Sequence, residues 1–347
     1  MAKFRRLRRW TGAITRPSVR RYRSRSLERI FLHVGVEKTG TTTLQVAMAI
    51  NRPLLRQCGY AIPTGLPDFP CHHIGLALCA ANPDAVPELR QVARLTSDAA
   101  YCTFLENYPM QIAGELAESG CQTAILSNEH CSSRLSTATE IAKLHEIIGR
   151  LAHEYRVIIY LRRQDDLVAS HYSTAVRSGT SAEFNLPSEA GWLNYLDLLE
   201  IWAQVFGEEN LAVRIFEPQQ LKDGDLLSDL FSIVGFARQD ELLRPEHQNR
   251  SFDVYTVEFL RRFNAPLSTN AEGGLDPVRG DIDKALGAIT TRECFAAKRA
   301  SGNRVPEPVR GIKRRSCAPV FESGRRNAIH KRAARHSAGA VAHLGRR

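Results

Sequence analysis

The sequence predicts an α/β fold, in which a central parallel sheet is flanked by helices, on the basis of three observations. Short apolar runs alternate with stretches of helical periodicity along most of the chain, as they do in parallel-sheet proteins. The first apolar run ends in a loop rich in glycine, lysine and threonine, and a helical pattern follows at once. The chain has 347 residues, of which 43% are hydrophobic, and this is enough to form a substantial core.

Four apolar runs have the length and flanking residues of buried strands. Their ranges are 29–34, 122–127, 156–161 and 211–216. Each run is followed by a helical pattern, so we expect parallel strands that are joined by helices.

Helices are predicted where apolar residues recur every three or four positions. The first helix begins near Thr42, restarts at Pro53 and ends at Gly59. Thr137 and Glu140 have the spacing of a capping box and start another helix. The remaining helices are expected at 103–118, from 165 onward, and at 192–206, 226–234 and 252–263, whereas the rest of 60–121 gives no clear pattern.

The loop after the first strand is the most informative segment. Gly35 and Gly40 have the spacing of the glycines in a nucleoside-triphosphatase loop, GxxxxGK[ST], but Thr41 stands where that loop has its lysine. The lysine of this loop, Lys38, precedes the second glycine. Backbone N–H groups and the positive end of the following helix favour an anion here. The segment therefore predicts a phosphate site, although a turn without a ligand could have the same composition.

Polar side chains also follow the second and third predicted strands. Glu129 and His130 come just after the second strand, Arg162 ends the third, and Ser170 lies eight residues further on. Ligands of open parallel sheets bind at the carboxyl ends of the strands, so we expect these side chains to meet the Lys38 loop at one edge.

Two alternatives stay open for these residues. Arg162 can offer a fork of donors to a phosphate, or it can pair with Asp165 or Asp166 at the start of the next helix. Glu129 and His130 can serve a site, or they can cap a helix or lie on the surface. Neighbouring side chains on an extended backbone point to opposite faces, so only one of these two is expected to reach the site.

Two of these segments resemble PAPS-dependent sulfotransferases, where PAPS is 3′-phosphoadenosine 5′-phosphosulfate. Lys38-Thr39-Gly40-Thr41-Thr42 is similar to the 5′-phosphosulfate loop of that family. The apolar strand that ends in Arg162, with Ser170 eight positions later, is similar to its 3′-phosphate site. The second segment departs from the family at Gln164, where many members carry proline, and at Leu167, where many carry arginine. The resemblance covers about 29–263.

The resemblance implies a three-layer sandwich like that of the P-loop-containing nucleoside-triphosphate hydrolases, and in-line transfer of a sulfuryl group from PAPS to a hydroxyl or amine. It implies a small-molecule or glycan acceptor and no metal. Glu129 is the expected base, and His130 is the alternative. Lys38 would stabilise the leaving group, and the nucleotide contacts would come from Lys38, Thr39, Gly40, Thr41, Thr42, Thr43, Arg162 and Ser170.

The cysteines and histidines do not indicate a metal site. The chain has eight cysteines, and none of them forms a CxxC pair. Cys71-His72-His73 together with Cys79 comes closest to a metal-binding motif, but this spacing fits no standard zinc template. We therefore predict loop or core roles for these residues and no metal ligands.

The net charge of +10 comes from the two ends of the chain. Residues 1–30 and 301–347 each carry +10, whereas 31–300 carries −10. We therefore predict a basic, poorly ordered tail over 1–28, a sulfotransferase domain over 29–265, and an extension with a basic end over 266–347. The tails are expected to be solvated or to contact an anionic surface.

Two other functions fit parts of the sequence: a P-loop kinase or NTPase with an atypical loop, and a non-enzymatic protein that binds polyanions through its tails. Specific nucleic-acid recognition is not expected, because the body is acidic and carries no known motif. No apolar run reaches the roughly 18 residues of a membrane span, and the N-terminus lacks the apolar core of a signal peptide, so we expect a cytoplasmic protein. The sequence does not predict an oligomeric state.

Overall fold

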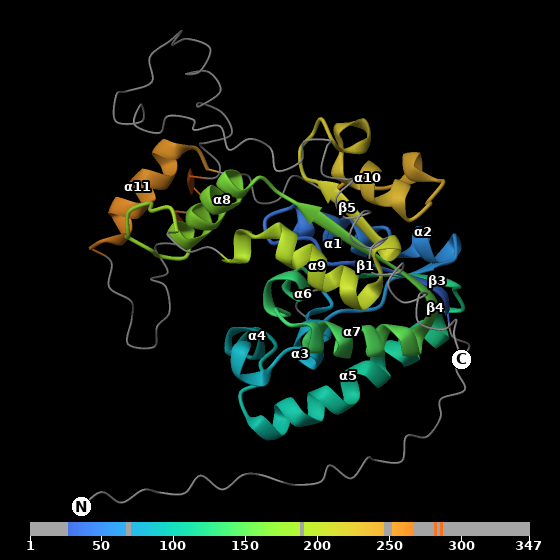
Figure 1. Ribbon diagram of the computed structural model, residues 1–347. Helices are drawn as coiled ribbons and strands as arrows, with labels where there is room; N and C mark the ends of the chain where they lie inside the picture. The colour runs from blue at the N-terminus through green and yellow to red at the C-terminus, as the bar shows by residue number, and fades with distance from the viewer. Residues whose placement is uncertain are drawn as a thin grey trace, which may run out of the picture. The chain divides into compact units, whose positions relative to one another are not determined.

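The computed structural model describes residues 27–66, 71–187, 191–245, 252–266, 281–282 and 285–286. A five-stranded sheet lies at the centre of these residues, with the strand order β2-β3-β1-β4-β5 (Figure 1). All neighbouring strands are parallel. The strands are β1 (Leu27–His33), β2 (Tyr60–Ala61), β3 (Thr123–Ser127), β4 (Ala152–Leu161) and β5 (Leu211–Ile215).

Helices cover both faces of the sheet, as the sequence predicted, and create the three layers that the family resemblance implied (Figure 1). Alternate strand residues point to opposite faces, so each buried strand contributes to two separate apolar cores. Phe31 and Ile158 belong to the core under α1 (Thr41–Ile50), α2 (Arg52–Gln57) and α10 (Leu226–Ile233). Leu32 and Val157 belong to the core under α3 (Ile74–Ala80), α5 (Asp98–Ser119), α7 (Ala138–Leu151) and α9 (Tyr195–Phe206).

Shorter helices and turns complete the connections. The other α-helices are α4 (Pro87–Val92), α6 (His130–Arg134), α8 (Gln164–Arg177) and α11 (Val254–Asn264). Single turns of 3₁₀-helix lie at Pro83–Ala85, Gly191–Leu193, Glu208–Asn210, Lys222–Gly224 and Gln239–Glu241.

The four predicted strands and most of the predicted helices agree with this structure, whereas β2, α3, α4, α6 and the first turn of α5 were not predicted, and one helix begins later than expected. The capping box forms as expected: the N–H of Glu140 donates to Thr137 Oγ1, and the N–H of Thr137 donates to Glu140 Oε2 (3.3 and 3.1 Å). β2 was not predicted, because a strand of two residues has no periodicity to detect. The helix expected over 192–206 begins only at Tyr195, because Asn194 caps it by accepting a hydrogen bond from the N–H of Asp197.

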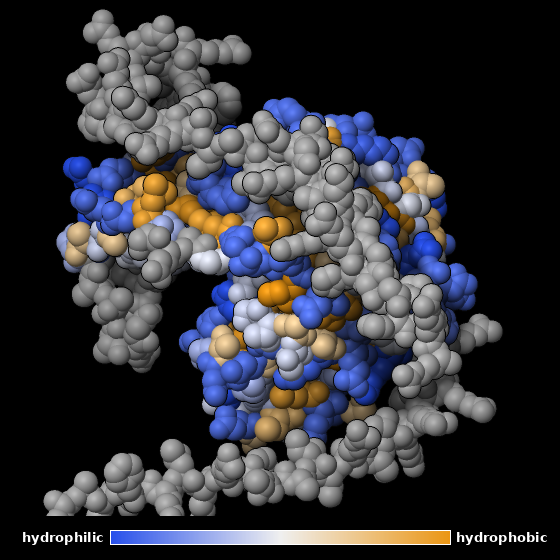
Figure 2. Space-filling view, viewed as in Figure 1, coloured by the Kyte–Doolittle hydropathy of each residue, from blue (hydrophilic) through white to orange (hydrophobic). Residues whose placement is uncertain are grey.

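α8 and α11 pack together to one side of the sheet (Figure 1). The side chain of Asn264 joins them by donating to the carbonyls of Val176 and Thr180 (2.8 and 2.9 Å). α11 leaves Val254 and Tyr255 exposed, and apolar side chains gather on the surface over this pair of helices (Figure 2).

The predicted tail and C-terminal extension lie almost entirely outside the described residues, so their roles stay predictions. Among the described residues, no helix has both the length and the apolar character needed to cross a bilayer.

Candidate functional site

The loops that follow β1, β3 and β4 leave the sheet side by side, because β1 lies between the other two strands. Backbone hydrogen bonds continue past the ends of the strands. The N–H of Val36 donates to the carbonyl of Tyr160, and the N–H of Asn128 donates to that of His33 (3.0 and 2.9 Å). The structure therefore brings the predicted site residues of three loops to one edge.

The Lys38 loop has a constrained backbone. Lys38 and Gly40 both have positive φ angles, 66° and 78°, and this region is unfavourable for a residue with a side chain. A Cβ atom on Gly40 would also lie 2.5 Å from a methyl group of Leu226. Inside the loop, the buried Thr39 donates its hydroxyl to the carbonyl of Val36 (2.7 Å). The Thr39 side chain therefore holds the loop in shape and is not available to a ligand.

The start of α1 has the features of an anion site. The first N–H groups of a helix have no intrahelical acceptor, and no side chain caps those of Thr41, Thr42 and Thr43. The Thr41 hydroxyl is buried and has no hydrogen-bond partner among the described residues. Thr42 is exposed and Thr43 is partly exposed. A phosphate or sulfate at this helix end would satisfy both the backbone donors and the Thr41 hydroxyl.

Lys38 lies among charges of both signs. It is partly buried, and this burial lowers the pKa of Lys38. The Glu37 and Glu129 carboxylates raise the pKa but do not outweigh the effect of burial. Arg162 and Arg177 lower it further. Arg177, at the end of α8, is a cation that the sequence did not single out. Together these side chains place three cations and two carboxylates around the loop.

Arg162 points to the Lys38 loop. Its Nη1 donates to the carbonyl oxygen of Lys38 (2.7 Å), and its guanidinium carbon lies 5.8 Å from the centre of the Phe216 ring. The salt bridge at the start of α8 is made by the next residue, Arg163, with Asp165 (2.7 Å). The alternative ion pair proposed for Arg162 is therefore wrong, and four of its five N–H donors are left for other partners.

Ser170 lies on α8 and is partly exposed. Its carbonyl accepts a hydrogen bond from the Thr174 hydroxyl (3.1 Å), and its own hydroxyl has no hydrogen-bond partner among the described residues. The next residue, His171, places its Nε2 4.0 Å from Glu37. α8 therefore borders the site, and the assignment of Ser170 to it stays a prediction.

Glu129 is held by two side chains from other parts of the chain. Gln45 Nε2 donates to Glu129 Oε2 (3.1 Å), and His72 Nε2 lies 3.2 Å from the same oxygen. Burial alone would raise the pKa of Glu129, but the contact and charge of His72 and the charge of His130 outweigh it and lower the pKa to about 2. The carboxylate is therefore ionised and well anchored.

The side chains of His130 and Glu129 lie close together and both contact this group of residues. The expectation that only one of them would reach it is therefore wrong. That expectation assumed an extended backbone, whereas Glu129 is helical (φ −68°, ψ −25°) and immediately precedes α6. Nδ1 of His130 is buried and lies 3.5 Å from Glu37 Oε1. Glu37 also accepts a hydrogen bond from the Ser133 hydroxyl (2.7 Å). Burial opposes ionisation of Glu37, but the contacts with His130 and Ser133 and the charge of Arg134 lower its pKa to about 2.

Sequence reasoning missed Glu37, Gln45, His72 and Arg177. Glu37 stands next to Lys38 and could have been noticed, because it is an acidic residue inside a loop predicted to bind an anion. His72 belongs to the Cys71-His72-His73 segment, for which a loop or core role was predicted, and neither its contact with Glu129 nor that of Gln45 could be predicted, because 57 and 84 positions separate these residues from Glu129. Their place depends on how α1 and the segment before α3 pack against the end of β3.

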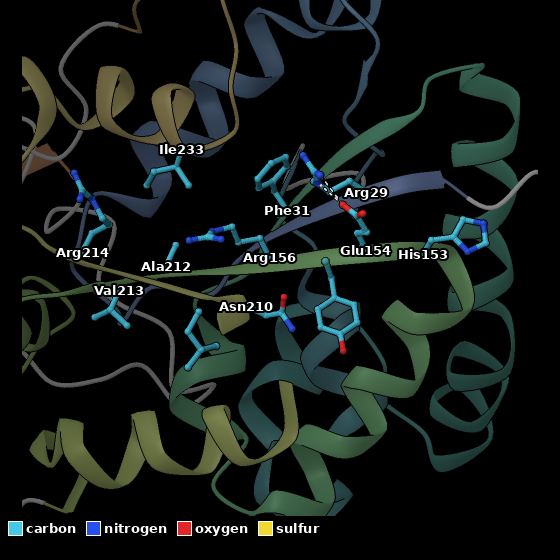
Figure 3. A pocket seen from close by; sticks show the side chains of 12 residues that line it. Arg29, Phe31, His153, Glu154, Arg156, Asn210, Ala212, Val213, Arg214 and Ile233 are labelled. Carbon is cyan, nitrogen blue, oxygen red and sulfur yellow. Dashed lines mark hydrogen bonds and ion pairs between the residues drawn. The ribbon is translucent and has the colours of Figure 1, made fainter. Parts of the chain in front are cut away.

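A separate cavity among the described residues lies away from these side chains. It has a volume of about 790 Å³ and covers the first part of β4 and the neighbouring residues of β1 and β5. Figure 3 shows Arg29 paired with Glu154 there, with Arg156 and Arg214 on the same side of the strands. It contains none of the predicted site residues.

Comparisons with known proteins add little to this geometry. No protein-family model matches the chain. A protein of Archaeoglobus fulgidus described as uncharacterized is 28% identical over 139 residues, which are 39% of this chain and only 38% of that protein.

Two solved structures resemble the chain. A sulfotransferase from Alicyclobacillus acidocaldarius has a TM-score of 0.36 and 18% identity over 77% of this chain and 97% of its own. A sulfotransferase domain from the curacin biosynthetic pathway has a TM-score of 0.33 and 15% identity over 76% and 99%. TM-scores and identities as low as these are no evidence for the activity of this chain. The functional assignment therefore depends on the residues of the site.

Proposed function

We propose that the protein transfers a sulfuryl group from PAPS to a hydroxyl or amine of a small-molecule or glycan acceptor. The observation that supports this most directly is the hydrogen bond from Arg162 Nη1 to the carbonyl of Lys38 (2.7 Å). It brings a guanidinium beside the open helix end at Thr41–Thr43. PAPS carries anionic groups at both its 3′ and 5′ positions, so a protein that binds it needs two neighbouring sites for anions.

The 5′-phosphosulfate would occupy the start of α1. The N–H groups of Thr41, Thr42 and Thr43 and the unpaired Thr41 hydroxyl would hold its oxygens. When the bond between sulfur and the bridging oxygen breaks, negative charge develops on that oxygen. The Lys38 ammonium would stabilise this charge, and a preorganised donor of this kind typically contributes about 3–4 kcal/mol.

The 3′-phosphate would bind to Arg162 and Ser170. Arg162 uses one N–H for the Lys38 carbonyl and keeps a fork of donors for a phosphate. The Ser170 hydroxyl, which has no hydrogen-bond partner among the described residues, would add one donor. Because Arg162 contacts the Lys38 loop directly, binding at one site would also stabilise the other.

The acceptor must lose a proton as it attacks. Its oxygen or nitrogen forms a bond to sulfur, the bridging S–O bond breaks, and the electron pair leaves with adenosine 3′,5′-bisphosphate. We assign the proton to His130, because its Nδ1 faces the Glu37 carboxylate and its Nε2 makes no hydrogen bond to the described residues. Glu129, already bound by Gln45 and His72, would orient the acceptor hydroxyl.

Calorimetry with adenosine 3′,5′-bisphosphate in the presence of EDTA tests the nucleotide site. Binding without magnesium is expected, together with transfer of labelled sulfate from PAPS to an acceptor. ATP binding that requires magnesium would favour the kinase alternative. Nucleotide binding that is lost when residues 1–28 and 301–347 are removed, and that falls steeply with salt, would favour the polyanion-binding alternative.

A further inference from the structure

Three potential metal ligands from separate parts of the sequence converge beside the Lys38 loop. One ligand atom each from His72, Glu129 and His130 lie within 4.8 Å of one another. His72 comes from the segment before α3, whereas Glu129 and His130 stand where α6 begins. The three side chains are 10%, 16% and 21% exposed, so a small ligand can reach them but bulk water is largely excluded.

We propose that His72, Glu129 and His130 bind a Zn²⁺ ion, with the fourth coordination position open. A tetrahedral zinc site with bonds of about 2.0–2.2 Å separates neighbouring ligand atoms by roughly 3.3–3.5 Å. His72 Nε2 and Glu129 Oε2 are 3.2 Å apart, so this pair already has nearly the required separation. One ring nitrogen of His130 lies within 4.8 Å of a ligand atom from each of the other two residues, and we take Nε2 as the third ligand because Nδ1 faces Glu37.

The surroundings supply the outer contacts that such sites use. Gln45 donates to Glu129 Oε2 (3.1 Å) and fixes the carboxylate. The other nitrogen of His130, Nδ1, lies 3.5 Å from the Glu37 carboxylate. A carboxylate behind a ligating histidine orients the ring and raises its basicity, and loss of such a contact typically weakens metal binding about 10–100-fold.

The donor set favours zinc over the alkaline-earth ions. Two imidazoles and one carboxylate suit Zn²⁺ and its transition-metal neighbours, whereas Mg²⁺ and Ca²⁺ prefer oxygen ligands alone. Charges of both signs lie nearby: Glu37 and Glu129 attract a cation, while Lys38, Arg134 and the two arginines beside Lys38 oppose it. We therefore infer a reversible site that responds to the zinc concentration, and not a permanent structural centre.

Zinc at this position would inhibit sulfuryl transfer, and this consequence rests on the function proposed above. Coordination uses the lone pair of His130 Nε2, which would otherwise accept the acceptor proton. It also occupies the Glu129 oxygen, which would otherwise orient the acceptor hydroxyl. Binding of the nucleotide at Lys38 and Arg162 would be less affected, because neither residue is a ligand.

Zinc binding is measured on the untagged full-length chain, by competition with a chromophoric chelator and by the visible absorption of the Co²⁺ derivative. One high-affinity ion per chain and the intense absorption of tetrahedral Co²⁺ are expected. His130→Ala and Glu129→Gln should each weaken binding at least tenfold, and Glu37→Gln should weaken it less. His153→Ala, at an exposed histidine outside the group, is the matched control and should bind like the wild type.

Thermal unfolding shows whether each variant folds. If His130→Ala does not fold, Glu129→Gln still tests the site, because it keeps the shape of the side chain. The sequence also contains His330, His336 and His343, so zinc binding alone is not sufficient. Equal zinc affinity of the wild type, His130→Ala and Glu129→Gln would overturn the site.

The transfer assay separates the two proposals. If the wild type transfers sulfate and zinc inhibits it with the affinity found by direct titration, the inhibitory role is supported. Zinc binding to the three residues without any inhibition would overturn that role. If no transfer occurs under any condition, the proposed function fails, and the zinc site is still judged by the titrations alone.

Discussion

The guanidinium of Arg162 donates a hydrogen bond to the backbone carbonyl of Lys38, although the two residues are 124 positions apart. The bond connects the end of β4 to the loop after β1. Arg162 therefore supports the conformation of the loop and also presents a positive charge beside it. The next residue, Arg163, has the same charge but pairs with Asp165 on the surface.

Replacement of Arg162 by alanine should weaken binding of adenosine 3′,5′-bisphosphate by roughly tenfold to a hundredfold, since a hydrogen bond to a charged group contributes about 1.5–3 kcal/mol. Arg163→Ala is the control and should change the affinity less than threefold, because an exposed ion pair contributes little. Calorimetry on the two variants gives the comparison. Equal affinities of Arg162→Ala and wild type would show that the 3′-phosphate binds elsewhere.

Lys38→Ala should lower the rate of sulfuryl transfer by about two to three orders of magnitude, the usual effect of removing a donor that stabilises transition-state charge. Nucleotide affinity should fall less, because the N–H groups of α1 are unchanged. Lys143→Ala, on the exposed side of α7, should behave like the wild type. Single-turnover assays with PAPS measure the chemical step, and an undiminished rate for Lys38→Ala would exclude Lys38 from catalysis.

Gly75→Ala tests the packing that positions the segment before α3. A Cβ atom at Gly75 would lie 2.5 Å from the Cε atoms of the buried Tyr108, so we expect a loss of roughly 1–3 kcal/mol in the free energy of unfolding. Gly114→Ala, in α5, meets no atom within 4 Å and should stabilise the protein by up to about 1 kcal/mol. Denaturant unfolding compares the two, and stabilisation by Gly75→Ala would contradict the packing of α3 on α5.

Asp229 should contribute to stability in a pH-dependent way. It is fully buried, and it accepts hydrogen bonds from Arg214 Nε and the Tyr160 hydroxyl (2.9 and 2.8 Å). Burial alone would raise the pKa of Asp229, but these contacts and the N–H of Lys222 lower it. Asp229→Asn should cost about 3 kcal/mol, the low end of the range for a broken buried pair, since Arg214 keeps solvent access.

The sign of the pH effect follows from the lowered pKa. A carboxyl group that ionises more readily in the folded state adds its full stability above its unfolded pKa, which is near 4, and loses it as the pH falls further. The difference in unfolding free energy between wild type and Asp229→Asn should therefore be constant from pH 7 to 5 and shrink below pH 4. Unfolding curves measured across this range test it, and a difference that grows on acidification would show that Asp229 is not stabilised as an anion.

The local elements of this chain could be predicted because their signals are local. The apolar runs at 29–34, 122–127 and 156–161 gave the central strands, and Thr137 with Glu140 gave the start of α7. The two residues of β2 carried no such signal. Ser97, which caps α5, lies in a stretch whose prolines obscured the helical pattern.

The sequence by itself determined that a Lys-Thr-Gly-Thr-Thr loop follows the first strand and that an arginine ends the third predicted strand, because both are properties of short segments. Only the tertiary structure decided that Arg162 and not Arg163 turns to that loop, and that Gln45 and His72 hold Glu129. The physical reason is that the order of strands in the sheet and the packing of helices on it bring distant side chains together, and no pattern within a single segment records those contacts.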